Sequence, residues 1–354
     1  MTSKERVKAA IELKEADRMP VQAGCAPELT FALMKKFNQY DYPKLCVELG
    51  NDLLLTRTGK SIFDIGPFDF PEGEDEMVGP WGCRWKKEIT EKGANCAIID
   101  GPLYNDDEDG RLLKEYQIPV PEDSDFDDLR KLVAEYGETH WITAFIGDGI
   151  FQPAWALHGM ENMMVDMLAN PDYANEIFDK VMKFSIDAGE KMIDCGADMV
   201  MVSDDMGSQE NMLISPDMWR TFMKPRMADM ISTFKKRNPK IVFAYHSCGY
   251  IIPIIDELIE IGVDVIQPIQ PLSMDPAVLK EKFGSRVCLW GGIDTQKTLP
   301  MGTKEQIREE IKLRRETVGN GGGYICAPSH VVQSDTSIDN IMEFYEAART
   351  LGKY

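Results

Sequence analysis

Strand-like runs of apolar and β-branched residues alternate with amphipathic helical segments along most of this 354-residue sequence. The alternation is typical of βα units around a parallel sheet, because parallel neighbours need a helical crossover between them. Eight runs are predicted as strands, at residues 19–24, 51–56, 141–147, 198–205, 240–249, 264–269, 286–292 and 323–330. Eight such units predict an α/β fold of the (β/α)8 TIM barrel type, with a doubly wound sheet as the lesser alternative.

The segments between the strands carry helix signals. Ser215 is predicted to cap a helix, and Ser337 or Asp339 is predicted to cap the last one. Gly196 and Gly262 each follow a helix and precede a strand, where glycine takes a left-handed conformation without steric cost. The plainest helices are predicted at 171–194, 215–237, 250–261, 303–319 and 336–352.

One segment, residues 61–121, breaks this rhythm. It has glycine, proline and acidic turns between short alternating runs, which is typical of hairpins. We therefore expect a β-rich subdomain, built from hairpins, inserted at 61–121 into a single barrel domain that spans residues 1–354.

Composition excludes several classes of partner. The chain has 59 acidic against 39 basic residues and a formal charge of −20, so neither nucleic acid nor an anionic membrane is an expected partner. It has no apolar run of the length that a signal peptide or membrane span needs, so a cytoplasmic location is expected. Its eight cysteines are then expected to be free thiols.

A histidine and a cysteine stand two positions apart at the end of the strand predicted at 240–249. Alternate residues of a strand share a face, so His246 and Cys248 should point together at the carboxyl end of the barrel, where active sites lie. Cys326, in the last predicted strand, is expected at the same rim. One imidazole and two thiolates with a fourth position open suit a catalytic zinc ion. A buried structural histidine with two inert thiols stays an alternative.

Other polar and aromatic residues are predicted near the same rim. Asp204 and Asp205 follow the fourth strand, and either is a candidate proton acceptor or ligand-orienting group. His330 is a third candidate catalytic residue. The candidates for substrate binding are Gln209, Gln267, Trp155, Trp290 and Asp294. The alternatives are helix caps for the aspartates, loop hydrogen bonds for the glutamines and core positions for the aromatics.

Longer stretches carry a family resemblance. The segments HSCGYIIPIIDELIEIGVDVIQPIQP, LWGGIDTQKTLPMGT and GGGYICAPSH, with VSDDMGSQENMLISPDMW upstream, resemble the uroporphyrinogen decarboxylase superfamily. Within it they resemble the zinc-dependent corrinoid methyltransferase branch, from about residue 140 to the end. The resemblance implies a barrel whose carboxyl-end funnel holds zinc through His246, Cys248 and Cys326.

The resemblance also implies a function. A methyl group would pass between a small molecule, either a donor such as a methoxylated aromatic or a thiol or pterin acceptor, and a corrinoid. The chain has no DxHxxG cobalamin motif, so the corrinoid is expected on a separate protein.

Two alternatives stay open. Decarboxylases of the superfamily carry an arginine-rich RQAGR stretch where this chain reads MPVQAGCAPELTF, which disfavours decarboxylation. A non-catalytic zinc-binding barrel is the other alternative. The sequence leaves the oligomeric state open, and a homodimer is the commonest closed form.

Overall fold

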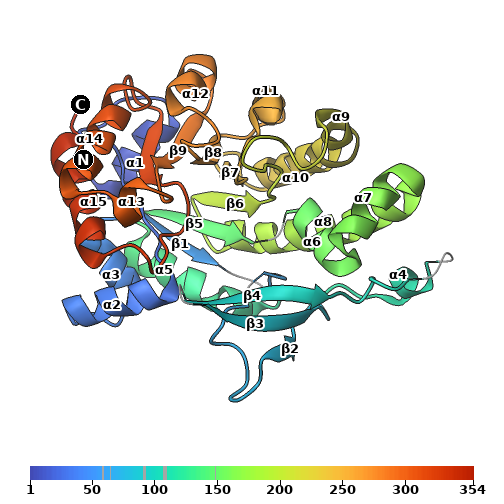
Figure 1. Cartoon of the computed structure of the whole chain (residues 1–354). Helices are drawn as coiled ribbons and strands as arrows, with labels where there is room; N and C mark the ends of the chain where they lie inside the picture. Colours follow the sequence, from blue (N-terminus) through green and yellow to red (C-terminus); the bar gives the residue numbers. More distant parts are fainter. Residues whose placement is uncertain (58–59, 64, 91–92, 107–109, 148) are drawn as a thin grey trace.

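Seven parallel strands form one curled sheet at the centre of the molecule (Figure 1). The computed structural model describes residues 1–57, 60–63, 65–90, 93–106, 110–147 and 149–354. The sheet order is β1-β5-β6-β7-β8-β9-β10. Its strands are β1 (Leu53–Arg57), β5 (Trp141–Ile146), β6 (Met199–Ser203), β7 (Val242–His246), β8 (Val265–Ile269), β9 (Cys288–Ile293) and β10 (Tyr324–Pro328).

The first predicted strand, 19–24, lies between the first and last strands of this sheet. Val21 pairs in parallel with Cys326 of β10 through an isolated bridge. The carbonyl of Val21 accepts the Asp52 N–H, next to β1, at 2.8 Å. Eight chain segments thus surround one interior, which confirms the predicted (β/α)8 fold against the doubly wound sheet.

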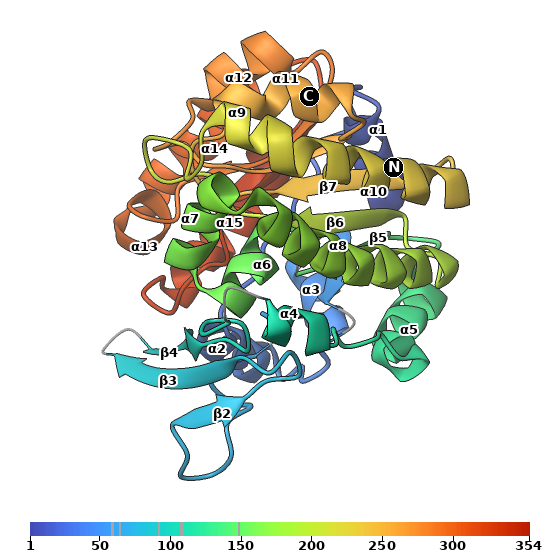
Figure 2. The ribbon, with the colours of Figure 1, turned by 90° about the vertical axis from the view of Figure 1, so that its right-hand side faces the viewer.

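Helices cover the outside of the sheet (Figures 1 and 2). They are α1 (Ser3–Ile11), α2 (Pro27–Phe37), α3 (Tyr42–Leu49), α4 (Arg111–Glu115), α5 (Asp127–Tyr136), α6 (Phe151–His158), α7 (Met160–Ala169), α8 (Pro171–Asp194), α9 (Pro216–Met218), α10 (Lys224–Arg237), α11 (Ile252–Glu260), α12 (Pro276–Phe283), α13 (Thr298–Met301), α14 (Lys304–Glu316) and α15 (Ile338–Leu351). A 3-10 turn (Asp123–Phe126) precedes α5, and a π-helical turn (Trp219–Met223) joins α9 to α10. No helix among the described residues is long and apolar enough to cross a bilayer.

Local signals set several helix ends as predicted. The Ser215 side chain accepts the N–H of Met218 at the start of α9, and Ser337 accepts that of Asn340 at the start of α15. Gly196 has a φ of 94° where the chain leaves α8, a conformation that favours glycine. The five predicted helices therefore match α8, α9 with α10, α11, α14 and α15.

Two apolar layers hold the barrel together. One lies between the sheet and the helices. The other fills the interior with alternate residues of the strands, among them Phe145, Met201, Ala244 and Ile325, so the barrel is a packed core and not a pore. Helix α1 adds Val7 and Ala10 to this interior layer and closes it at the amino ends of the strands.

A second, antiparallel sheet interrupts the barrel sequence between β1 and β5. Its strands are β2 (Glu76–Val78), β3 (Arg84–Thr90) and β4 (Gly93–Asp100). It lies on the side of the barrel away from α11 and α12 (Figures 1 and 2). Two residues between β2 and β3 join this sheet to the barrel helices. The Trp81 and Phe184 rings pack edge-on with their centroids 4.7 Å apart, and Phe184 belongs to α8. The Cys83 thiol donates to the Ala156 carbonyl of α6 at 3.3 Å. Residues 64, 91–92 and 107–109 of the predicted insertion 61–121 lie outside the described residues, and its separation as a subdomain stays a prediction.

Candidate metal centre

Strand β7 carries His246 to the carboxyl end of the barrel. His246 pairs in register with Ser203 of β6 and with Gln267 of β8. It stands two residues after Ala244, which belongs to the interior layer, so the imidazole faces the mouth of the barrel. Cys248 follows two residues later and turns to the same side. The two side chains therefore point to the same side, as their spacing of two residues predicted.

A glycine after Cys248 holds the loop that places the thiol. Gly249 has a φ of 77°, and a Cβ there would overlap the backbone of Gly207 and Ser208. Tyr250 N–H donates to the Ser208 carbonyl at 2.8 Å, which joins this loop to the loop after β6. Any larger residue at 249 would force the two loops apart.

Three side chains of different chemistry converge at the mouth. Cys248 Sγ lies 3.7 Å from His246 Nε2, and Asp205 Oδ1 lies 3.6 Å from the same nitrogen. Ligand atoms of all three lie within 4.8 Å of one another. A tetrahedral zinc ion with ordinary bond lengths separates sulfur and nitrogen ligands by about 3.6 Å, and nitrogen and oxygen ligands by about 3.4 Å. The donor set and its spacing therefore fit zinc.

The environment of His246 favours the neutral, metal-binding form. Burial lowers the pKa of His246, the Asp205 charge opposes this shift, and nearby His330 and Arg57 add to it. Gln267 Oε1 contacts His246 Nδ1. Because an amide oxygen only accepts, the proton sits on Nδ1 and the Nε2 lone pair points to Cys248 and Asp205.

Asp205 ties the group together. Its Oδ1 accepts the backbone N–H of Cys248 at 2.8 Å, and its Oδ2 lies 3.4 Å from Gln152 Nε2. Burial, together with the Asp205 charge, raises the pKa of the Cys248 thiol. A cation in this position reverses that preference, because it binds the thiolate and displaces the proton.

The structure does not bring Cys326 into this group. Cys326 is fully buried in the layer between sheet and helices, while its neighbours Ile325 and Ala327 face the barrel interior. Alternate residues of a strand face opposite sides, so Cys326 points away from the mouth. Burial raises the pKa of this thiol to about 12. Its role as a zinc ligand stays a prediction that this geometry does not support.

Asp204 caps a helix. Its carboxylate accepts the N–H groups of Ile150, Phe151 and Gln152 at 3.1, 2.9 and 3.0 Å, at the start of α6. The side chain is fully buried, and this burial raises its pKa to about 6. The structure therefore places Asp204 where the helix-cap alternative expected it, on the face of β6 opposite to Asp205.

The remaining predicted residues are scattered. His330 is exposed in the loop after β10 and near His246, and Gln209 is exposed in the loop after β6. Trp155 is half-buried on α6 with its ring 5.8 Å from that of Phe63. Trp290 is fully buried inside the barrel, and Asp294 accepts the Gln296 N–H after β9. Of these five, His330 is the one whose electrostatic effect lowers the pKa of His246, and it stands outside the group of three ligand residues.

The sequence did not predict two residues that lie beside the metal group, Arg57 and Phe145. Arg57 ends β1 and pairs in register with Phe145 of β5. The Arg57 guanidinium carbon lies 5.0 Å from the Phe145 ring centroid, and the His246 ring lies 6.1 Å from the same centroid. A charged residue directly after the predicted strand 51–56 was the available signal.

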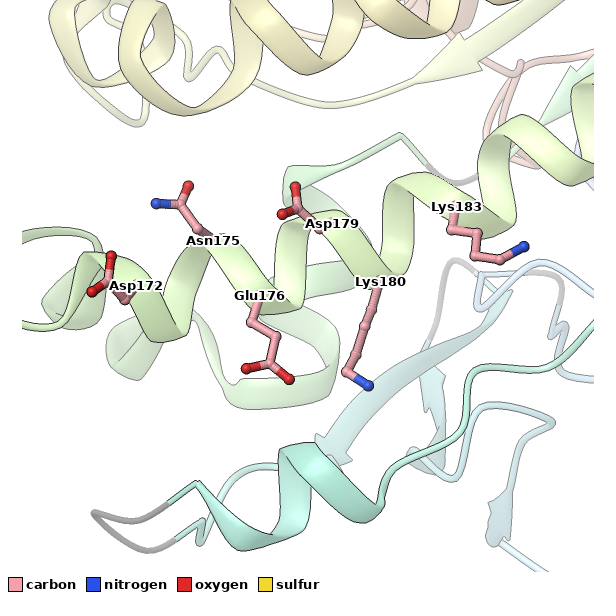
Figure 3. Close-up of a pocket in the computed structure, with 6 residues that line it drawn as sticks. All are labelled: Asp172, Asn175, Glu176, Asp179, Lys180 and Lys183. Atoms are coloured by element: carbon pink, nitrogen blue, oxygen red, sulfur yellow. The ribbon is translucent and has the colours of Figure 1, made fainter.

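A surface hollow on α8 lies apart from this centre (Figure 3). It is lined by Asp172, Asn175, Glu176, Asp179, Lys180 and Lys183. Arg226 already pairs with Asp179 and Asn175, and Lys180 contacts the Tyr116 carbonyl at 3.5 Å. The polar groups serve packing between neighbouring elements, and no substrate site is assigned there.

Fold and site together define a parallel (β/α) barrel with a thiol, imidazole and carboxylate group at its carboxyl end. The family model for uroporphyrinogen decarboxylase (URO-D) matches residues 106–351. The chain belongs to the uroporphyrinogen decarboxylase family.

Curated relatives in this family have two activities. The chain is 23% identical over 261 residues to the uroporphyrinogen decarboxylase of Trichodesmium erythraeum, covering 72% of this chain and 70% of the relative. It is 26% identical over 170 residues to the methylcobamide:CoM methyltransferase MtaA of Methanosarcina barkeri, covering 47% of each, so the match spans about half of that enzyme. A solved methyltransferase from Methanosarcina mazei has the same fold, with a TM-score of 0.71, 21% identity and coverage of 99% of this chain and 98% of that one.

Proposed function

We propose that this protein is a zinc-dependent methyltransferase that moves a methyl group between a small molecule and a corrinoid held by a separate protein. The observation that carries the proposal is the convergence of Asp205, His246 and Cys248 on one point at the barrel mouth. Similarity to the methylcobamide:CoM methyltransferase of Methanosarcina barkeri supports it. Fold alone would not, because one fold serves many reactions.

The chain's own residues have separable tasks. Cys248 and His246 would hold the ion, and Asp205 orients the Cys248 backbone while offering a third ligand. Bound zinc would supply Lewis-acid activation of the heteroatom that carries or receives the methyl group. Gln267 keeps the His246 proton on the far nitrogen. Asp205 or His330 would accept the proton that a thiol substrate releases.

Decarboxylation is the weaker candidate, although decarboxylases are among the relatives. The segment 19–31 has no arginine to bind the carboxylates of a porphyrinogen, and the chain carries a charge of −20. A cluster of thiol, imidazole and carboxylate is instead the donor set of a metal site. A purely structural ion would be closed by four protein ligands, whereas three are grouped here among the described residues.

Methyl transfer itself provides the test. The purified protein is mixed with methylcobalamin and a small thiol, or with cob(I)alamin and a methoxylated aromatic, and the cobalt absorbance is followed. We expect transfer in one direction that stops in Cys248→Ala and continues in Cys195→Ala, a matched control on a half-buried thiol at the end of α8. Transfer that survives Cys248→Ala, or faster decarboxylation of uroporphyrinogen than methyl transfer, would overturn the proposal.

A further inference from the structure

A histidine outside the metal group is buried where the chain after β4 meets two barrel helices. His158 ends α6, and its side chain is 7% exposed. Its Nδ1 lies 2.9 Å from the Leu103 carbonyl oxygen, and its Nε2 lies 2.7 Å from Asp166 Oδ2 of α7. Because Leu103 lies between β4 and α4, one imidazole contacts both α7 and the segment that follows the antiparallel sheet.

Both ring nitrogens of His158 face atoms that only accept hydrogen bonds. A carbonyl oxygen has no proton to donate, and neither has an ionised carboxylate. A neutral imidazole carries one N–H group, whereas an imidazolium carries two. Both contacts are therefore hydrogen bonds only when the ring is positively charged. The end of α6 also suits a cation, because a helix C-terminus carries partial negative charge.

The ionisable groups around this ring are acidic. Asp166 of α7 contacts it directly, and the Tyr173 ring of α8 lies 5.2 Å from it. The Tyr173 hydroxyl donates to Asp106 Oδ2 at 2.8 Å, and Glu176 adds a third negative charge beside Tyr173. Among the described residues, no lysine or arginine contacts the ring of His158. The charges that face this ring therefore match an imidazolium.

Loss of the ring proton would break one of the two contacts. The bond to Asp166 has an ionised acceptor and is the stronger one, so it keeps the remaining proton. The Nδ1 lone pair then faces the Leu103 carbonyl oxygen, and two acceptors repel each other. The segment keeps two neutral bonds to the helices, from the Leu103 N–H to the Leu157 carbonyl at 2.9 Å and from Asn162 Nδ2 to the Tyr104 carbonyl at 3.2 Å. Its attachment is then weaker but not abolished.

We propose that His158 is a pH-sensitive latch, whose positive charge holds the segment after β4 on α6 and α7. The latch is closed when the ring is protonated, and it loosens as the pH rises and the proton is lost. Helix α6 begins beside the metal group, where Gln152 contacts Asp205, and ends at this latch. The latch contains no metal ligand and is independent of the proposed function.

Hydrogen exchange of the full chain tests the latch, read by mass spectrometry on peptides that cover residues 101–106. After correction for the intrinsic effect of pH on exchange, protection of this segment should be about tenfold lower at pH 9 than at pH 6, because a bond from a charged donor is lost. Peptides from β5 should show no such change. His158→Gln should loosen the segment at both pH values, whereas His140→Gln, directly before β5, should behave as the parent.

A second measurement follows the ring itself. The chain has four histidines, so the His158 Cε1 signal of a 13C-histidine-labelled protein can be assigned by substitution of the other three, even if His158→Gln fails to fold. The signal should be that of a doubly protonated ring at pH 6 and should change in parallel with the loss of protection. Asp166→Asn removes the facing charge, so both changes should move to lower pH.

Two results would overturn the latch. One is a His158 ring that is already neutral at pH 6 in the parent protein. The other is a segment 101–106 whose protection, relative to that of β5, is the same at pH 6 and pH 9.

Discussion

The two ends of the barrel treat ionisable side chains in opposite ways. At the amino end, Asp52 is fully buried and binds Arg6 through Nη1 at 2.6 Å and Arg18 through Nη1 at 2.7 Å. Its carboxylate also accepts the Ser3 hydroxyl and the Val21 N–H. This carboxylate is surrounded by donors that join α1, the first segment and β1.

At the carboxyl end, ionisable side chains keep hydrogen-bonding positions that the described residues do not fill. His246 and Cys248 approach each other without a strong hydrogen bond, and Arg57 has no acidic partner among the described residues. The difference shows where the molecule is stabilised and where it is available for chemistry, because barrel enzymes place reactive groups at the carboxyl ends of strands.

The largest effect is expected at the amino end. Asp52→Ala would leave the mostly buried Arg18 guanidinium without a carboxylate and Arg6 with Asp17 as its remaining carboxylate, which costs about 3–5 kcal/mol of unfolding free energy. The measurement is equilibrium unfolding in urea. Asp205→Ala at the mouth, studied without metal, should cost less than about 1 kcal/mol because that side chain is half-buried. Equal losses at the two ends would break the comparison.

Gln267 tests the mouth without the substitution of a proposed metal ligand, because it contacts the ligand His246. Gln267→Leu removes the acceptor that fixes the His246 tautomer, so the dissociation constant for zinc should rise about 10- to 100-fold. Chelator competition measures this constant. Gln209→Leu, at an exposed position, should leave it unchanged. An unchanged zinc affinity in Gln267→Leu would mean that the amide does not position the imidazole.

Asp204 distinguishes a cap from a catalytic group. Asp204→Ala should lower the unfolding free energy by about 1–2 kcal/mol, because the α6 N–H groups lose their acceptor. Asp204→Asn keeps an acceptor oxygen and should retain most of the stability, the zinc content and the methyl transfer. Loss of transfer in a stable, zinc-loaded Asp204→Asn protein would instead assign Asp204 a catalytic role.

The smallest effect concerns acid stability at the amino end. The Arg6 hydrogen bond holds the pKa of Asp17 well below its usual range. A depressed carboxyl pKa contributes stability above the unfolded pKa of about 3.9, and this contribution is lost as the pH falls toward the folded pKa. Because Asp17 is 45% exposed, Asp17→Asn should cost less than about 1 kcal/mol at pH 7.

Melting temperatures of the parent and Asp17→Asn at pH 7 and pH 3 measure this contribution. The difference between the two proteins should narrow at the lower pH. A difference that widens on acidification would show that the Asp17 charge does not stabilise the fold.

The sequence predicted the eight barrel segments because hydrophobic runs, glycine turns and caps such as Ser215 and Ser337 are local signals. It also predicted, from strand alternation over 240–249, that His246 and Cys248 point together; β7 ends at His246, however, and the loop held at Gly249 is what places Cys248. These two expectations needed no knowledge of neighbouring strands.

The direction of Cys326 was beyond such signals. A barrel strand is apolar on both faces, so the alternation in residues 323–328 does not tell which face looks inward. The pairing of β10 with β9, which sets Cys326 opposite Gly291, fixes that choice only in the folded sheet. The alternation of neighbouring side chains between two faces also separates Asp204, which caps α6, from Asp205, which faces His246.

The zinc content of the purified protein is the most direct test of the candidate metal centre. It should be measured by elemental analysis, without added metal, for the parent, Cys248→Ala and Cys326→Ala proteins, with folding checked by circular dichroism. We expect about one zinc per chain in the parent and in Cys326→Ala, and none in folded Cys248→Ala. A parent protein without zinc, or zinc that is lost with Cys326 and retained without Cys248, would contradict the assignment of the mouth group.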